Sequence, residues 1–189
     1  MKNFTILPIL MLLGVAGCTS PPTQYQLDAP TSDLRLRAVV SSLEVRDVSL
    51  PQYASAADGI ALQQPDGSVK ADPKEVWADT PERATTLALA RNLAAITGTR
   101  VAAEPWPFAD LPAASVTVVV ERFLAAQGTG LRLQGAYAIS PVGSSLSDRG
   151  GRFDIAIPLP ENAATTDIAR AHGLAIERLA EEIARRISG

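Results

Sequence analysis

Cysteine and histidine are almost absent from this chain, because its 189 residues include only one of each. A single cysteine cannot form a disulfide within the chain, so packing alone must stabilise the fold. One thiol and one imidazole are also too few for the usual transition-metal sites, which collect several histidine and cysteine ligands. We therefore expect no bound metal and no other cofactor.

Catalytic motifs are equally scarce. A serine–histidine–aspartate triad could use only His172, and no Gly-x-Ser-x-Gly elbow occurs. Gly128-Thr129-Gly130 is not followed by a helical pattern, so it indicates a hairpin turn and not a phosphate-binding loop. Glu181 and Glu182 lie among arginines, as on the solvated face of a helix. We expect no enzymatic activity, with a hydrolase that uses His172 and a carboxylate as the alternative.

Excess positive charge and long apolar runs are missing as well. The formal net charge is −3, which gives no electrostatic reason to bind nucleic acid. The one apolar run, residues 4–13, follows Lys2 and is too short for a stable membrane span. This arrangement is typical of a secretion signal.

The segment after this run determines how the chain is divided. Leu13-Gly14-Val15-Ala16-Gly17-Cys18 resembles a bacterial lipobox, whose cysteine accepts a diacylglyceryl group on its sulfur. Cys18 is therefore the expected lipid attachment site, and two or three acyl chains make a stable anchor. We predict a signal peptide over 1–17, a lipidated tether over 18–24 and a single domain over 25–189.

The residue after the lipobox cysteine bears on location. In Gram-negative lipoproteins an aspartate there favours retention in the inner membrane, and this chain has Thr19. We therefore expect anchoring to the outer membrane, on its periplasmic face.

Hydrophobic periodicity predicts an α+β fold. Thr80, Pro81 and Gly98 mark the start and the stop of one helix, and an apolar stripe marks a second over 166–187. Alternating apolar residues predict strands over 25–27, 34–40, 43–50, 60–63, 68–71, 99–103, 115–125, 131–139 and 153–157. We expect a single α+β domain with a mainly antiparallel sheet and two principal helices packed on it.

Aromatic residues form only 5% of the chain, so those in irregular segments stand out. Tyr53, Trp77, Trp106 and Phe108 lie in or beside such segments. One interpretation is that they plug the ends of the sheet. The other is a surface that binds a partner protein or an acyl chain, because tyrosine and tryptophan are favoured anchors. With Pro51, the candidate binding residues are Pro51, Tyr53, Trp77 and Trp106.

The order of short motifs along the chain resembles a known family. After the lipobox come Tyr25-x-Leu27, Leu50-Pro51-x-Tyr53, Trp77-Ala78, the Leu87–Leu93 helix, a valine-rich strand and Leu179-Ala180-x-x-Ile183. This series resembles the ABC-type transport auxiliary lipoproteins of the paraquat-inducible protein C (PqiC) type. One departure is that residues 54–57 lack the basic residue that often follows Leu-Pro-x-Tyr, which puts in doubt any contact made by that charge.

The resemblance implies a non-catalytic role. Such proteins are outer-membrane accessories of MCE-type systems that move lipids between the two membranes. The expected partner is a PqiB-like periplasmic MCE-domain protein, and an ABC ATPase and permease would drive or gate transport in related systems. A homo-oligomer that caps a tubular partner is compatible with this role. The other hypotheses are a lipid-binding carrier, the hydrolase using His172, and an envelope assembly factor unrelated to lipids.

Overall fold

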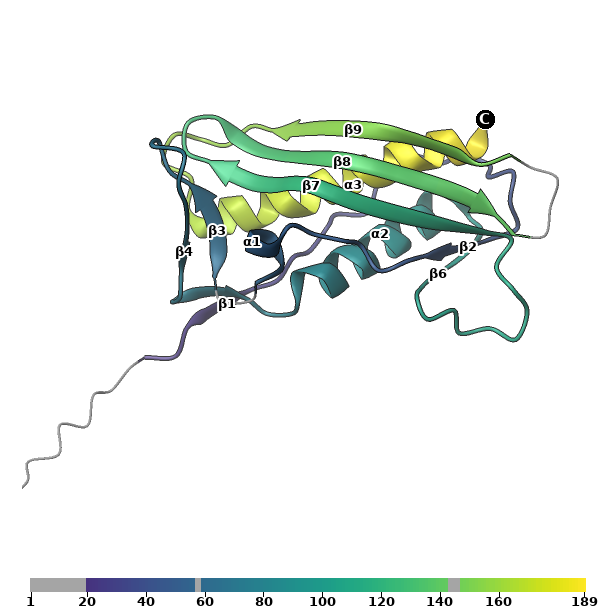
Figure 1. The fold of residues 1–189 in the computed structure, drawn as a ribbon, viewed down its shortest axis with the longest axis horizontal. Helices are drawn as coiled ribbons and strands as arrows, with labels where there is room; N and C mark the ends of the chain where they lie inside the picture. The colour runs from purple at the N-terminus through teal and green to yellow at the C-terminus, as the bar shows by residue number, and fades with distance from the viewer. Residues whose placement is uncertain (1–19, 57–58, 143–146) are drawn as a thin grey trace, which may run out of the picture.

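An elongated sheet backed by two long helices forms the molecule (Figure 1). The computed structural model describes residues 20–56, 59–142 and 147–189, so the expected signal peptide and Cys18 lie outside the described residues. The elements are β1 (Thr23–Tyr25), β2 (Ser42–Val45), α1 (Gln52–Ser55), β3 (Ile60–Gln63), β4 (Val69–Asp72), β5 (Glu75–Trp77), α2 (Pro81–Thr97), β6 (Arg100–Ala103), β7 (Ala114–Ala126), β8 (Gly130–Pro141), β9 (Arg149–Ile157) and α3 (Thr165–Ser188).

The longest pairings of the sheet are antiparallel. β7, β8 and β9 form a meander, in which Ala126 lies opposite Gly130 across a tight turn. Gly128 in that turn has a φ of 70°, a conformation that glycine adopts at no steric cost. The predicted hairpin of β3 and β4 is also antiparallel. The expected α+β domain with a mainly antiparallel sheet is confirmed.

Shorter strands add parallel pairings that the sequence did not indicate. β2 lies between β6 and β7 and runs parallel to both. β3 runs parallel to the other end of β7, while β1 and β5 form a separate parallel pair. β1 is the first strand of the described chain, and its partner β5 contacts β3 and β4. The chain therefore enters the domain at the end of β7 where β3 pairs.

The two predicted helices are present with nearly the expected ends. α2 begins with Pro81 at its first turn and ends at Gly98, whose φ is 65°. Thr80 occupies the N-cap position, although its side chain makes no capping hydrogen bond. At the start of α3, the Asp167 carboxylate accepts the Ala164 N–H at 3.1 Å.

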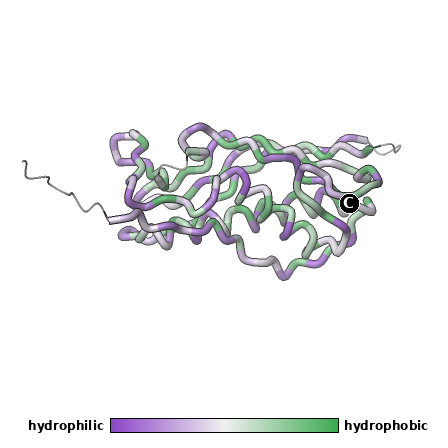
Figure 2. The backbone as a smooth tube through the Cα atoms, turned by 90° about the horizontal axis from the view of Figure 1, so that it is seen from below, coloured by the Kyte–Doolittle hydropathy of each residue, from purple (hydrophilic) through white to green (hydrophobic). Residues whose placement is uncertain are grey.

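Both helices cover the same face of the sheet and pack against each other (Figure 1). Hydrophobic and hydrophilic stretches alternate along them and along the strands (Figure 2). The alternation is what gives each element one face for the core. The largest fully buried side chains include Leu89, Leu93, Ile96, Leu131, Leu133, Ile176, Leu179, Ile183 and Ile187.

The predicted strand over 34–40 is wrong. Those residues are extended but belong to a segment, residues 26–40, that we call the strap and that runs over α2 and α3. The Leu36 N–H donates to the Ile96 carbonyl at 2.9 Å, and the Val39 N–H donates to the Ile187 carbonyl. Half-buried and exposed residues do alternate along the strap, but the half-buried ones face helices and not a neighbouring strand.

Ser32 fixes the strap to both helices. Its side chain is fully buried, its N–H donates to Asn92 Oδ1 of α2 at 3.0 Å, and its Oγ donates to Glu181 Oε1 of α3 at 2.6 Å. Nearby, the strap comes so close to α3 that a Cβ on Gly173 would lie 2.1 Å from the Asp28 carbonyl oxygen. The segment directly after the tether is thus part of the folded core.

Replacing Asn92 by leucine is expected to destabilise the protein by about 1–3 kcal/mol, because the buried Ser32 N–H loses its acceptor. Urea unfolding gives the measurement. Arg91→Ala is the matched control on the same helix, since its exposed ion pair with Asp28 contributes less than about 1 kcal/mol. Equal unfolding midpoints for the two variants would mean that Asn92 does not hold the strap.

Candidate functional site

Metal-binding clusters and membrane-spanning helices are not found in the described residues. Over 20–56, 59–142 and 147–189, no three histidine, cysteine, aspartate or glutamate side chains gather so as to hold a metal ion. In the same ranges no helix combines the length and the apolar character needed to cross a bilayer. A candidate site therefore has to be sought among surfaces and cavities.

His172 lies inside the core. Its Nδ1 is 2.8 Å from the Ile168 carbonyl oxygen one turn earlier in α3, and its ring packs against Trp77 and Phe123 at centroid distances of 5.1 and 4.4 Å. Burial lowers the pKa of His172 to about 4, so the ring is neutral at pH 7. Its described polar contact is with a backbone carbonyl, and this geometry gives the hydrolase hypothesis no support.

Two of the candidate binding residues lie around the same cluster. Trp77, at the end of β5, is only 8% exposed and contacts His172 edge-on. Tyr53 in α1 uses its hydroxyl oxygen to accept the Phe123 N–H at 3.2 Å, and Pro51 occupies the N-cap of that short helix. These contacts account for Tyr53 and Trp77 as parts of the packed end of the sheet.

Trp106 lies elsewhere, in the segment 104–113 between β6 and β7, which we call the aromatic loop. Its ring meets that of Phe108 edge-on, with centroids 4.9 Å apart. The guanidinium of Arg100, on β6, lies 4.6 Å from the Phe108 centroid and 5.7 Å from that of Trp106. Such cation–π contacts hold an arginine and two rings in one arrangement.

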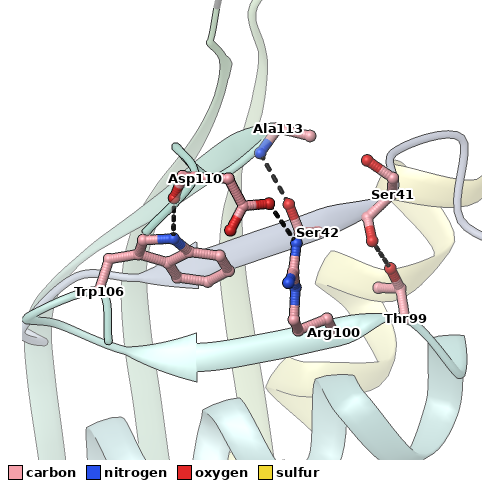
Figure 3. A network of polar contacts seen from close by, with 7 residues as sticks. All are labelled: Ser41, Ser42, Thr99, Arg100, Trp106, Asp110 and Ala113. Carbon is pink, nitrogen blue, oxygen red and sulfur yellow. Dashed lines mark hydrogen bonds and ion pairs between the residues drawn. The ribbon is translucent and has the colours of Figure 1, made fainter. Parts of the chain in front are cut away.

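Hydrogen bonds fix the path of the aromatic loop (Figure 3). Asp110 is the centre: its carboxylate pairs with Arg100 Nη2 at 2.6 Å, and its carbonyl accepts the Trp106 Nε1–H at 2.6 Å. At the end of the loop, the Ala113 N–H donates to Ser42 Oγ of β2 at 2.9 Å. The loop is irregular in conformation but well connected to β2 and β6.

The outer side of the aromatic loop is apolar. Phe108 is 42% exposed and Leu111 is 78% exposed, the largest exposure among the large hydrophobic side chains of the described residues. Val142, just after β8, is also exposed, and its N–H donates to the Ala113 carbonyl beside the loop. Sequence reasoning singled out Trp106 but missed Leu111. The available signal was an apolar residue placed between Asp110 and Pro112 in an irregular segment.

The cavities of the described surface are shallow and mixed in character. One of about 570 Å³ lies beside the start of α2 and is lined in part by Asp47, Glu82, Arg83 and Glu104. Another, of about 360 Å³, lies near β3, β4 and the start of α3, with Ile60, Leu62 and Ile168 on its walls and Lys70 beside them. Of these two, the second has the more aliphatic wall, although Asp72 and Glu75 also line it.

Comparison with known proteins gives two kinds of match. A family model described as "ABC-type transport auxiliary lipoprotein component" matches residues 25–184. The fold is similar to a crystal structure titled as an uncharacterized protein, with 20% identity, a TM-score of 0.68 and coverage of 89% of this chain and 100% of that chain. It is also similar to a Xanthomonas campestris protein of the family model DUF330, with 16% identity, a TM-score of 0.66 and coverage of 88% and 96%. Among curated proteins, none matches the sequence.

Proposed function

Because this chain belongs to the family of ABC-type transport auxiliary lipoprotein components, we propose that it docks the periplasmic MCE-domain component of an intermembrane lipid transport system. The observation that carries the proposal is the family match over 25–184, which begins seven residues after the Cys18 of the lipobox-like segment. Docking needs no catalytic residue, metal or cofactor, which suits a site made of surfaces.

The anchor gives this role its place in the cell. Lipidation of Cys18 would attach the protein to a membrane. Thr19 at the next position favours the periplasmic face of the outer membrane. Five residue steps separate Cys18 from Thr23, the first residue of β1, so the chain between them spans at most about 18 Å. The folded domain then stays close to the membrane surface and offers a fixed contact to a partner that reaches across the periplasm.

Co-purification tests the proposal. The full lipidated chain, extracted in detergent, is expected to retain the MCE-domain protein of the same organism, with an MCE protein from an unrelated system as the negative control. Assays with and without added phospholipid separate a direct contact from one that lipid mediates. If the cognate MCE protein is not retained in either condition, the proposed function is wrong.

The aliphatic cavity favours the lipid-carrier hypothesis as a second candidate. Its volume of about 360 Å³ and its Ile60, Leu62 and Ile168 walls suit part of an acyl chain. Lys70, Asp72 and Glu75 also line it, and these charges suit a zwitterionic headgroup. Native mass spectrometry of the protein purified without its own lipid anchor decides between the two. A co-purifying phospholipid supports a carrier, whereas a lipid-free protein that still retains the MCE partner supports docking alone.

A further inference from the structure

Residues 107–111 of the aromatic loop expose apolar side chains around one charged residue, which is paired. Residues 107–111 are all exposed, and Asp110 is the only charged residue among them. Its carboxylate is paired with Arg100 at 2.6 Å. Phe108 and Leu111 flank it, so the surface presents hydrocarbon to water without a free charge, as protein contact sites do.

The exposed face of the long strands provides a contrast. There Arg152 reaches from β9 to Glu121 on β7 at 2.6 Å, and Arg132 pairs with Asp154 at 2.7 Å. Val119, which is 50% exposed, lies two residues before Glu121, and its partner Ala136 on β8 lies opposite Arg152. Exposed apolar residues are thus not gathered there as they are on the aromatic loop.

The aromatic loop is also held in one conformation before any partner arrives. Trp106 packs beneath Phe108, its Nε1–H is bonded to the Asp110 carbonyl, and Arg100 contacts both rings. A surface that is already ordered loses little conformational freedom on binding, which favours affinity. Binding hot spots are enriched in aromatic residues and arginine, and the aromatic loop contains both kinds in contact.

The aromatic loop lies at the end of the sheet remote from the tether. It precedes β7, while the chain enters at the opposite end, where β3 pairs with Ala125 and Ala126 (Figure 1). The 12 residue steps of β7 span about 40 Å, more than twice the reach of the chain between Cys18 and β1. The loop therefore lies at the end of the sheet farther from the tether.

Charge also argues against a lipid surface as the occupant. Loops and helices that bind anionic headgroups combine apolar residues with free lysine or arginine. Within 100–113 Arg100 is the only basic residue, and it is paired with Asp110 and contacts two aromatic rings. Glu104, the first residue of the loop, adds a negative charge.

We propose that the aromatic loop is the surface by which this protein docks its transport partner, with Leu111 and Phe108 seated on an apolar patch of the periplasmic MCE-domain protein. This inference rests on the proposed function and names the surface that carries it out. The patch on the partner exposes aliphatic or aromatic side chains and needs no compensating charge, because Asp110 is already neutralised.

Leu111→Asp in the full lipidated chain tests the inference by measured affinity for the MCE-domain protein. We expect binding to weaken at least about tenfold, because the substitution places a charge inside an apolar contact. Val119→Asp is the matched control, since it places the same charge at another exposed aliphatic residue. It should leave binding unchanged. Urea unfolding midpoints of both variants check that the folds are equally stable, and Phe108→Ser, a second variant without added charge, should weaken binding as well.

The outcomes separate the two levels of the argument. If the wild type binds and Leu111→Asp and Phe108→Ser bind equally well, the docking surface is elsewhere and this inference is wrong, while the proposed function stands. If the wild type does not bind, both fail. Flotation of the unlipidated Cys18→Ser chain with vesicles of phosphatidylethanolamine and phosphatidylglycerol, lost on adding Leu111→Asp, would assign the loop to the membrane and overturn the inference.

Discussion

Replacing Cys18 by serine is expected to move the protein from the membrane fraction to the soluble periplasmic fraction with its fold unchanged. The hydroxyl of serine does not replace the thiol that takes the diacylglyceryl group, and each acyl methylene contributes roughly 0.8 kcal/mol to membrane binding. In the described ranges no helix is long and apolar enough to cross a membrane. Residues 1–17 are exchanged for an ordinary cleavable secretion signal, so that export does not depend on lipidation. Cell fractionation and circular dichroism give the two readouts.

Ser20→Ala is the control for this experiment, because it changes the tether two residues further on and leaves the thiol in place. It should remain membrane-bound. Sedimentation of Cys18→Ser with membranes would contradict the anchor assignment. Full complementation of the deletion strain by the soluble form would show that the tether is dispensable, and the proposed docking role would lose its geometrical basis.

The two long helices could be predicted because their signals are local. Proline fits the first turn of a helix, and glycine at a left-handed position ends one, so Pro81 and Gly98 mark α2 without reference to the rest of the chain. The meander of β7 to β9 follows from alternation and a glycine-rich turn in the same way. Sequence reasoning finds the elements whose formation depends on residues close by in the sequence.

The strap shows where local reasoning fails. Its alternating Leu34 and Leu36 have the period of a strand, but an extended chain laid over two helices has the same period. The partners that decide between these cases, Ile96 and Ile187, are distant in sequence. No property of the strap's own residues distinguishes a sheet neighbour from a helix neighbour.

The candidate binding residues show the same limit. Trp77 was a candidate because aromatic residues are few in this chain. Its burial, however, depends on His172 and on the end of the sheet. Trp106 is similar in sequence context but lies in a loop whose conformation depends on Arg100 and Ser42. Whether an aromatic residue plugs the core or supports a surface is decided by distant contacts.

Acidification from pH 7 to pH 5 is expected to reduce the free energy of unfolding by about 2 kcal/mol through His172 alone. Burial lowers the pKa of this imidazole from 6.5 to about 4 in the folded protein. Below pH 6.5 the unfolded chain therefore binds a proton that the folded chain does not, and each pKa unit is worth about 1.4 kcal/mol. Stability from this group is complete above pH 6.5 and falls until about pH 4. Urea unfolding of the soluble Cys18→Ser form at several pH values measures the slope.

His172→Phe identifies the source of that slope. Phenylalanine keeps a ring between Trp77 and Phe123 but cannot take up a proton, and His172 is the only histidine of the chain. Most carboxylates contribute below pH 5, because their ordinary pKa values are near 4. Burial raises the pKa values of Glu177 and Glu182, but both residues are present in the variant as well, so the difference between the two proteins reports the imidazole. The variant should therefore lose most of the dependence between pH 7 and pH 5, whatever its absolute stability. An equal slope in both proteins would show that the imidazole is accessible to protons in the folded state, which would revive a chemical role for it.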